Sequence, residues 1–150
     1  GTRQSFTSRT YSYTFEGTMT ADGGVDADTL GRTTWTFLHT MASTHPISPT
    51  PSQISRVKRF MYDFSHVYPC APCAYSFRQI MAQYPVDATT GPRFAQWMCT
   101  VHNEVNKEIG KPLFDCSKVG DKWGVCESCA AHQEELDSFM RMVKQTRHSH

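Results

Sequence analysis

The sequence predicts an all-α fold: a four-helix bundle and a short fifth helix, between a flexible N-terminal arm and a C-terminal helical tail. Apolar residues recur at spacings of three and four along four consecutive segments, which is the pattern of amphipathic helices. Prolines and glycines separate these segments, and no alternation of period two persists in the chain, so a sheet is disfavoured. Four such helices with short connections are typical of a bundle.

The first predicted helix begins at residue 28 or 29, because the side chain of Asp28 or Thr29 can cap it. Its end is expected at His45 and Pro46, because proline disfavours the α conformation of the residue before it. The residues at helical spacing are Leu30, Thr34, Trp35, Leu38 and Met41.

The second predicted helix has a clear N-terminal signature. Thr50 is the expected N-cap, Pro51 occupies the first helical position, and Gln53 follows three residues after the cap. The helix should stop at Tyr68 because Pro69 follows it. Its expected apolar face consists of Ile54, Val57, Phe60, Met61, Phe64 and Val67.

Two further helices and two shorter helical segments are expected. The third helix starts within residues 70–73, ends before Pro85, and should bury Ala74, Phe77, Ile80, Met81 and Tyr84. The fourth begins near Gly91, and Gly110 is placed to end it in the left-handed conformation. Its apolar residues are Phe94, Trp97, Met98, Val101, Val105 and Ile109. A short turn over 118–123 and a last helix over 130–144 complete the pattern.

Length and charge bound the organisation of the chain. With 150 residues it can form one domain with a hydrophobic core but not two ordinary ones. We predict a flexible arm over 1–27, a folded domain over 28–124 and a tail over 125–150. A net charge of +1 gives no indication of nucleic acid or an anionic membrane as partner. The apolar runs are too short for membrane insertion.

Six cysteines are the unusual feature of the composition, and they include two Cys-x-x-Cys pairs. Cys70 and Cys73 lie where an apolar helix begins, and a helix N-terminus stabilises a thiolate, which favours thiol exchange. The alternative is a zinc site in which this pair joins Cys126 and Cys129. A thioredoxin-like fold is disfavoured, because its Cys-x-x-Cys lies in a strand–helix unit that this sequence lacks.

The remaining cysteines fall into two further pairs. Cys99 and Cys116 would close a loop that ties the fourth helix to the segment after it, and a disulfide there would stabilise the fold by about 3 kcal/mol. Cys126 and Cys129 follow Gly124, outside the four-helix pattern. A pair on such a segment can carry electrons between a buried site and an outside partner. The alternatives are a tail pair without a role and a second structural bridge.

Three motifs occur in a particular order along the chain. They are Gly31-Arg32-Thr-Thr-Trp35-Thr-Phe-Leu38-His39-Thr40, then Tyr68-Pro69-Cys70-Ala-Pro-Cys73, then the run from Cys99 to Cys116 that contains His102, Asn103, Val105, Asn106 and Lys111. Together they closely resemble the Erv/ALR family of FAD-dependent sulfhydryl oxidases, over about residues 30 to 124.

The resemblance implies that the bundle encloses FAD. The implied cofactor-binding residues are Gly31, Arg32, Trp35, His39, Tyr68, Cys99, His102, Asn103, Val105, Asn106, Lys111, Lys122 and Trp123. By their charge, Arg32, Lys111 and Lys122 are candidates to contact the phosphates or the ring edge. His102, Asn103 and Asn106 are polar residues on an otherwise apolar helix, and a bound cofactor would satisfy their hydrogen bonds.

The resemblance also implies a reaction. Cys73 would lie against the flavin and Cys70 would exchange with the incoming thiol, so that electrons pass from this pair to FAD and on to dioxygen, giving hydrogen peroxide. No cysteine precedes Cys70 in this sequence. Cys126 and Cys129 are therefore the expected shuttle pair that passes substrate electrons to Cys70 and Cys73.

The implied partners are thiol-containing protein substrates or a dithiol oxidoreductase, with dioxygen or cytochrome c as electron acceptor, and a second copy of the chain paired through the first two helices. Disulfides argue against a reducing cytosol; the family suggests the mitochondrial intermembrane space first and the endoplasmic reticulum lumen second. Two alternatives stay open. One is a zinc-stabilised helical interaction module without catalytic activity, and the other is a redox carrier without cofactor, which leaves His102, Asn103 and Asn106 unexplained.

Overall fold

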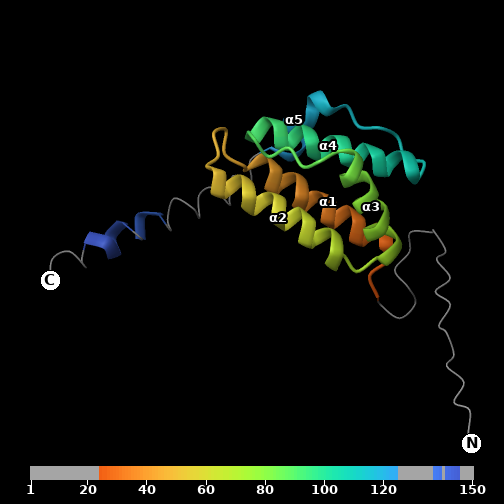
Figure 1. The fold of residues 1–150 in the computed structure, drawn as a ribbon, viewed down its shortest axis with the longest axis horizontal. Helices are drawn as coiled ribbons and strands as arrows, with labels where there is room; N and C mark the ends of the chain where they lie inside the picture. The colour runs from red at the N-terminus through yellow and green to blue at the C-terminus, as the bar shows by residue number, and fades with distance from the viewer. Residues whose placement is uncertain (1–23, 125–136, 140, 146–150) are drawn as a thin grey trace, which may run out of the picture.

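Four helices joined by short connections make up most of the described part of the chain (Figure 1). The structure is a computed structural model that describes residues 24–124, 137–139 and 141–145. The elements are α1 (Ala27–Ser43), α2 (Pro51–Val67), α3 (Ala71–Gln83), α4 (Gly91–Glu108), the 3₁₀ turn η1 (Cys116–Lys118) and α5 (Val119–Trp123). Within these described residues there is no strand. The predicted all-α bundle with a short fifth helix is confirmed.

The start of α1 differs from the expectation. The N-cap is Asp26, whose side chain accepts a hydrogen bond from the backbone N–H of Thr29 at 2.6 Å. The predictions of Asp28 or Thr29 as cap were wrong, because three residues able to cap lie within four positions and the helix takes the earliest. Asp28 lies inside the first turn, and its carboxylate is free for contacts elsewhere.

The start of α2 is confirmed in detail. The backbone N–H of Gln53 donates to the Thr50 hydroxyl at 3.2 Å, and the backbone N–H of Thr50 donates to the Gln53 side chain at 2.8 Å. The helix ends at Val67, directly before Tyr68. The predicted apolar face was wrong at Phe60 and Val67, which are 36% and 75% exposed. Among the described residues both side chains stay exposed, and helical spacing alone cannot foresee this.

At the ends of α3 and α4, helical spacing again predicts burial for residues that are exposed. Tyr84 and Ile109, both expected to be buried, are exposed where the two helices finish. Gly110 does adopt the left-handed conformation, with φ of 68°, as predicted. Of the tail helix predicted over 130–144, residues 137–139 and 141–144 are helical, and residues 130–136 and 140 lie outside the described residues.

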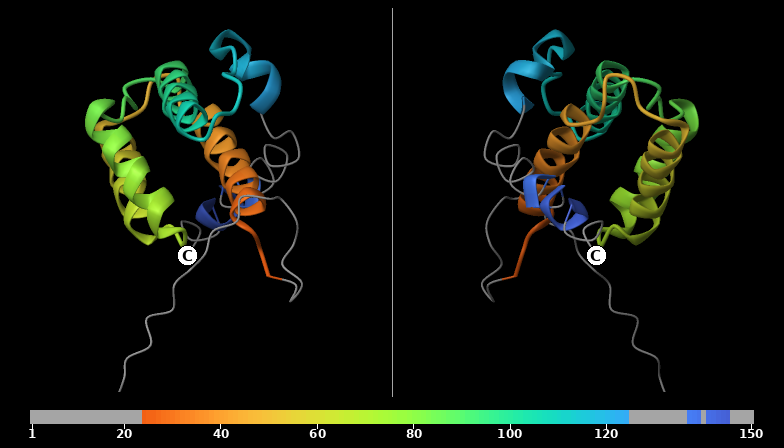
Figure 2. Two further views of the ribbon diagram at one scale, coloured as in Figure 1. Left: turned by 90° about the vertical axis from the view of Figure 1, so that its right-hand side faces the viewer. Right: turned by 90° about the vertical axis from the view of Figure 1, so that its left-hand side faces the viewer.

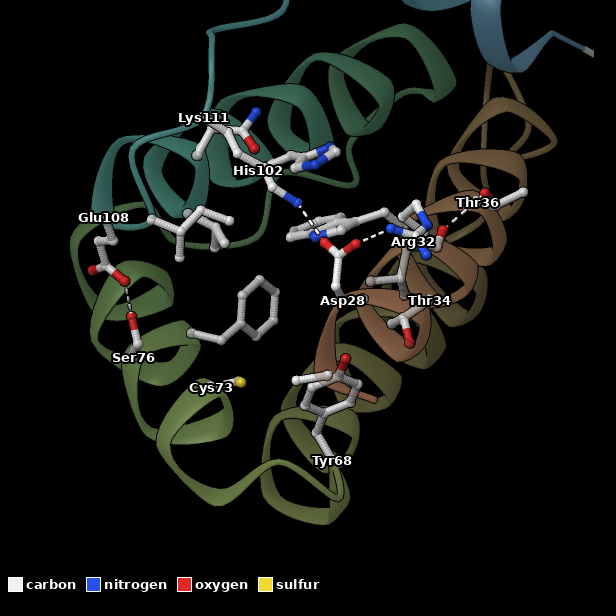
Figure 3. Close-up of a pocket in the computed structure, with 18 of the residues that line it drawn as sticks. Asp28, Arg32, Thr34, Thr36, Tyr68, Cys73, Ser76, His102, Glu108 and Lys111 are labelled. Carbon is white, nitrogen blue, oxygen red and sulfur yellow. Dashed lines mark hydrogen bonds and ion pairs between the residues drawn. The ribbon is translucent and has the colours of Figure 1, made fainter. Parts of the chain in front are cut away.

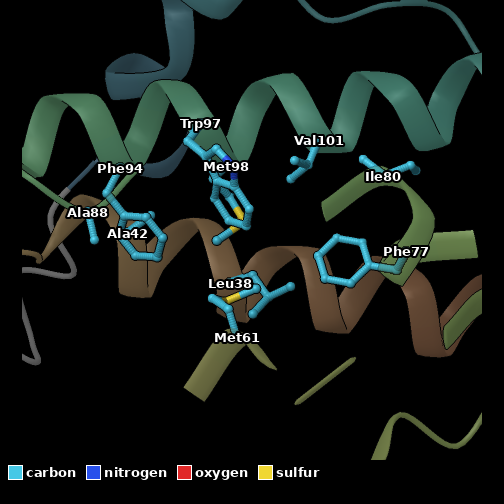
Figure 4. Close-up of a cluster of buried hydrophobic side chains, with 10 residues drawn as sticks. All are labelled: Leu38, Ala42, Met61, Phe77, Ile80, Ala88, Phe94, Trp97, Met98 and Val101. Carbon is cyan, nitrogen blue, oxygen red and sulfur yellow. The ribbon is translucent and has the colours of Figure 1, made fainter. Parts of the chain in front are cut away.

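The core lies where α4 crosses between its neighbours. Figure 2 shows α1 and α3 on opposite sides of the bundle with α4 between them. The fully buried side chains at this junction include Leu38 of α1, Met61 of α2, and Phe94, Met98 and Val101 of α4 (Figure 4). Their burial supplies the hydrophobic free energy that holds the helices together. None of the described helices is long and apolar enough to cross a membrane.

Candidate functional site

A cavity of about 620 Å³ opens between α1, α3 and α4, and α5 contributes to its wall (Figure 3). Large aromatic and apolar side chains form most of its lining: Trp35, Leu38, Phe64, Tyr68, Phe77, Val105, Ile109 and Trp123. Charged side chains lie at its rim, namely Asp28, Arg32, Glu108, Lys111 and Lys122. A mostly apolar cavity with a few convergent polar groups is the usual form of a small-molecule site.

A disulfide lies at the wall of this cavity. Cys70 and Cys73 are bonded to each other at the start of α3, with Cys70 as the N-cap residue. Cys73 lines the cavity and is exposed, whereas Cys70 is only 8% exposed (Figure 3). One sulfur of the pair therefore faces the cavity while the other is covered by protein.

Four rings form a connected assembly beside the disulfide. Trp35 stacks on His102 with ring centroids 4.0 Å apart, and His39 stacks on Trp123 at 3.7 Å. The two imidazoles share a hydrogen bond of 2.9 Å between Nε2 of His39 and Nδ1 of His102. The assembly joins α1, α4 and α5, so it fixes the relative positions of three walls of the site.

Burial keeps both imidazoles neutral. It lowers the pKa of His39 to about 3, with further lowering by His102 and Lys122. It likewise lowers the pKa of His102 to about 4, with the charges of Lys122 and Lys111 adding to the effect. At neutral pH one imidazole therefore donates and the other accepts the shared hydrogen bond, and the aromatic wall carries no charge.

Three cations lie around the cavity. Asp28 of α1 pairs with Arg32 one turn further along the helix and, at 2.6 Å, with Lys111 in the segment after α4. The Lys122 ammonium lies over the Trp123 ring, 4.7 Å from its centroid. Arginine and lysine side chains placed in this way are suited to bind phosphate groups.

The cavity brings together most of the residues predicted for a site. Those that line it are Gly31, Arg32, Trp35, Tyr68, Cys73, His102, Val105, Asn106, Lys111, Lys122 and Trp123. His39 and Cys99 are not among the lining residues: His39 lies behind His102 and Trp123, and Cys99 is buried in a disulfide with Cys116. That disulfide is the one predicted from the spacing of the two cysteines.

Asn103 also lies away from the cavity lining. Its side-chain N–H donates to the carbonyl of Phe114 at 2.9 Å, and its side-chain oxygen accepts from the backbone N–H of Phe114 at 2.9 Å. The same amide nitrogen lies 3.5 Å from the sulfur of Cys116. In this structure Asn103 fastens the segment after α4 to the helix, next to the disulfide that does the same.

Some lining residues were not predicted as site residues. Phe77 was assigned to the core, yet it lies one turn after Cys73 on the cavity side of α3. Ser76 donates a hydrogen bond to Glu108 and links α3 to the end of α4 at the rim. Asp28 was considered only as a cap. The spacing of four between Cys73 and Phe77, and between Asp28 and Arg32, is the signal that could have found two of them.

The zinc alternative needs four thiolates, and the structure removes two of them. Cys70 and Cys73 are bonded to each other, and a disulfide sulfur is not a thiolate ligand. Cys126 and Cys129 lie outside the described residues. Among the residues that are described, no group of three or more His, Cys, Asp or Glu side chains is arranged to hold a metal ion.

The shape and chemistry of the cavity fit a flat ligand that carries phosphates. Trp35 and Trp123 offer ring faces, Arg32 and Lys111 offer positive charge at the rim, and the sulfur of Cys73 lies at the wall. Fold and site together define a class: a helical-bundle protein with a Cys-x-x-Cys disulfide at the wall of a site for a flat, phosphate-bearing ligand.

Comparison with known proteins identifies the family within that class. The sequence profile of the Erv1 / Alr family matches residues 32–124. Because this match covers more than half of the chain, the protein belongs to the Erv1 / Alr family. The resemblance noted in the three sequence motifs is thereby confirmed.

Several curated proteins are similar to this chain. The FAD-linked sulfhydryl oxidase ERV1 of Arabidopsis thaliana is 43% identical over 119 residues, which cover 77% of this chain and 62% of that protein. The mitochondrial FAD-linked sulfhydryl oxidase erv1 of Schizosaccharomyces pombe is 46% identical over 93 residues, or 61% of this chain and 51% of that one. The chain thus spans about half to three fifths of the length of these relatives.

Solved structures agree with the sequence comparison. The FAD binding domain of Erv1 from Saccharomyces cerevisiae superimposes with a TM-score of 0.65 at 38% identity, covering 67% of this chain and 96% of that one. The yeast Erv1 core gives a TM-score of 0.66 at 36% identity, covering 78% and 92%. The bundle described above is therefore the fold of these domains.

Proposed function

We propose that this chain is an FAD-linked sulfhydryl oxidase that forms disulfides in protein thiols with reduction of dioxygen to hydrogen peroxide. The observation that carries the proposal is the Cys70–Cys73 disulfide at the wall of the aromatic cavity, with Cys73 on the cavity side. A disulfide placed there can exchange electrons with a ligand inside the cavity and with thiols outside it. The similar curated proteins of Arabidopsis and yeast are named for this activity.

The lining residues divide into those suited to the rings and those suited to the phosphates of FAD. Trp35, His102 and Trp123 offer aromatic faces and edges, while Arg32 and Lys111 offer positive charge. When bound, FAD supplies an acceptor for the two electrons of a dithiol and passes them to dioxygen. The neutral imidazoles of His102 and His39 keep the aromatic wall uncharged beside it.

The cysteine pair performs thiol–disulfide exchange. A substrate thiolate attacks the sulfur of Cys70, the Cys70–Cys73 bond breaks, and a mixed disulfide with Cys70 forms. The second substrate thiol then displaces Cys70, so that the substrate leaves as a disulfide and Cys70 and Cys73 are both reduced. The Cys70–Cys73 bond then forms again, and the two electrons and two protons that this pair gives up reduce one dioxygen to one hydrogen peroxide. Because Cys70 is only 8% exposed, the segment before α3 must open locally to admit the thiol.

We further propose that Cys126 and Cys129 form the shuttle between protein substrates and Cys70–Cys73. Both lie outside the described residues, on the chain that follows α5. The substrates are thiol-containing proteins or a dithiol oxidoreductase, and cytochrome c is an alternative acceptor to dioxygen. The compartment proposed is the mitochondrial intermembrane space, with the endoplasmic reticulum lumen second; the yeast and Schizosaccharomyces relatives are named as mitochondrial.

A homodimer is proposed through the outer surfaces of α1 and α2. Phe37 of α1 is 55% exposed and Phe60 of α2 is 36% exposed, and their rings lie edge to face, 6.1 Å apart. Two adjacent exposed aromatic side chains favour a surface covered by protein. The pairing of the first two helices across a two-fold axis is what the family resemblance implies.

The test of the activity starts from the full chain purified without added flavin. We expect a yellow protein with flavin absorbance that consumes oxygen when given dithiothreitol and forms peroxide in equal amount. Cys73→Ser should keep the colour, because the aromatic and cationic residues are intact, and should lose oxygen consumption. Colourless protein that holds stoichiometric zinc would overturn the proposal in favour of the zinc-stabilised module.

The shuttle has a separate test. The double variant Cys126→Ser, Cys129→Ser is assayed with dithiothreitol and with a reduced folded protein. We expect it to oxidise dithiothreitol, which reaches Cys70 directly, and to lose most activity on the protein thiol. Full retention of both activities would remove the shuttle from the proposal while leaving the oxidase itself intact.

A further inference from the structure

The carboxylate of Asp28 is bonded to two cations at the rim of the cavity. One oxygen pairs with Arg32, and the other accepts from the Lys111 ammonium at 2.6 Å. Arg32 also donates to the Thr29 hydroxyl at 3.0 Å, so its guanidinium is held against α1. Figure 3 shows the Asp28 carboxylate between the two cations, with Lys111 approaching from the α4 side.

The arrangement joins two exposed cations, with side chains 62% (Arg32) and 45% (Lys111) exposed, to a more covered carboxylate. Asp28, Arg32 and Lys111 all line the same cavity, and the pair with Lys111 joins residues 83 positions apart in the sequence. The Asp28 side chain is only 28% exposed. It is not needed to cap α1, because Asp26 does so. The bridge therefore connects the first turn of α1 to the segment after α4, across the rim of the site.

The bridge reduces the repulsion between the two cations at the rim when no phosphate is bound to them. Arg32 and Lys111 together carry two positive charges at the rim, and two like charges there repel each other. The single negative charge of Asp28 binds both and leaves a net charge of +1. Arginine and lysine bind carboxylate and phosphate oxygens by the same charge-assisted hydrogen bonds, so the Asp28 carboxylate uses the donors that a phosphate would need.

We propose that Asp28 is a clasp that competes with the phosphates of the bound cofactor for Arg32 and Lys111. In the empty protein it holds these cations at the rim, and in the loaded protein they turn to the phosphates. Asp28 thereby weakens the binding of phosphate-bearing ligands and leaves the binding of the ring system unaffected. This inference rests on the proposed function, since FAD is the ligand concerned.

The expected effects follow from removing one negative charge. Without it, a diphosphate group meets two unpaired cations, so Asp28→Asn should bind FAD about twofold to fivefold more tightly, the range for exposed ion pairs. Riboflavin carries no phosphate, so its affinity should be unchanged. The salt dependence of FAD binding should become steeper, because screening acts on a larger net attraction. The empty variant should melt at a lower temperature, because it lacks the bridge between α1 and Lys111.

The experiment titrates the flavin-free full chain with FAD and with riboflavin, following flavin fluorescence at several salt concentrations. Asp28→Asn and Asp28→Ser provide two neutral variants, and circular dichroism checks that both are helical. Asp28→Glu keeps the charge and should keep the wild-type affinity. Asp63→Asn makes the same charge change on α2, away from the cavity lining, and should alter neither ligand's binding.

The possible results distinguish a failure of the clasp from a failure of the proposed function. FAD binding that is equal or weaker in both neutral variants overturns the clasp and leaves the oxidase proposal standing. Riboflavin affinity that changes as much as FAD affinity also overturns it, because the effect would then concern the ring site. Failure of every form, wild type included, to bind FAD overturns the proposed function, and the clasp with it.

Discussion

The side chains of His39 and His102 determine how the protein responds to acid. Their folded-state pKa values, about 3 and about 4, lie below the ordinary value of 6.5. Between these values and 6.5 the unfolded chain binds more protons than the folded one, so stability is lost as the pH falls through that window. We expect each imidazole to remove at most about 1.4 kcal/mol per pH unit from the free energy of unfolding.

Urea unfolding at pH 7, 6, 5 and 4.5 measures this loss. Asp87 does not interfere in that range: its hydrogen bonds from Thr89 and then Arg93 lower its pKa to about 2, so its contribution is lost only below its ordinary value of 3.8. His39→Gln should flatten the pH dependence, because it removes one of the two titrating groups. An equal free energy of unfolding at pH 7 and pH 4.5 in the wild type would contradict the assignment.

Gly91 is required by a close approach of two backbone segments. A Cβ atom at this position would lie 2.4 Å from the carbonyl oxygen of His45, which is backbone and cannot rotate away. We expect Gly91→Ala to lower the free energy of unfolding by about 1 to 3 kcal/mol. Gly120→Ala is the matched control, since its Cβ would meet no atom within 4 Å. Thermal melts that place both variants level with the wild type would show that the loop shifts freely.

Residue roles were predictable from sequence only where local chemistry decides them. The capping box of Thr50 and Gln53 was foreseen, because both partners lie within one turn. The clasp of Asp28 was not, because its partner Lys111 is distant in sequence. The predicted contact of Asn103 with the cofactor stays a prediction. The bond from its amide to Phe114 was not foreseen, because it depends on how the chain folds back after α4.

At the scale of elements, the position of α5 depends on the segment between α4 and α5. The Cys99–Cys116 disulfide and the hydrogen bonds between Asn103 and Phe114 both fasten this segment to α4. Trp123, at the end of α5, stacks on His39 and lines the cavity. The disulfide therefore supports the cavity wall indirectly, through the position of α5.

Removing that disulfide should affect stability and ligand binding together. We expect Cys99→Ser with Cys116→Ser to lose about 3 kcal/mol of unfolding free energy, from the entropy of the opened loop. Flavin should also be released more readily on dilution, because Trp123 and Lys122 are less firmly placed. Denaturant unfolding and flavin fluorescence measure the two effects. Lower stability with unchanged flavin release would confine the disulfide to a purely structural role.

Helical periodicity predicted which segments are helices and where most of them end. It did not predict which apolar residues are covered, because coverage depends on a neighbour. Phe60, Val67, Tyr84 and Ile109 fit the spacing and yet are exposed. Three of them, Val67, Tyr84 and Ile109, lie at or next to helix ends.

At the scale of the whole molecule, the site arises from contacts between segments far apart in sequence. α1, α3 and α4 each contribute to one cavity, and α5 completes its wall. The cysteine spacing alone left zinc, structural and redox roles open, and the three motifs in family order were needed to choose among them. Periodicity could not have placed Trp35 against His102 or Cys73 beside the cavity, because both depend on how the helices cross.

The last prediction concerns the assembly of two chains. If α1 and α2 pair with a second copy through the surface that holds Phe37 and Phe60, a charge at position 37 would be buried without a partner. We expect the wild type to sediment as a dimer and Phe37→Glu as a monomer that keeps its helical content, since Phe37 is exposed within the single chain. Ile47→Glu, at an apolar residue that is 77% exposed in the loop after α1, should remain dimeric. A wild type that sediments as a monomer at micromolar concentration would contradict the dimer and leave Phe37 and Phe60 exposed to solvent. A Phe37→Glu variant that stays dimeric would show that the interface lies on another face.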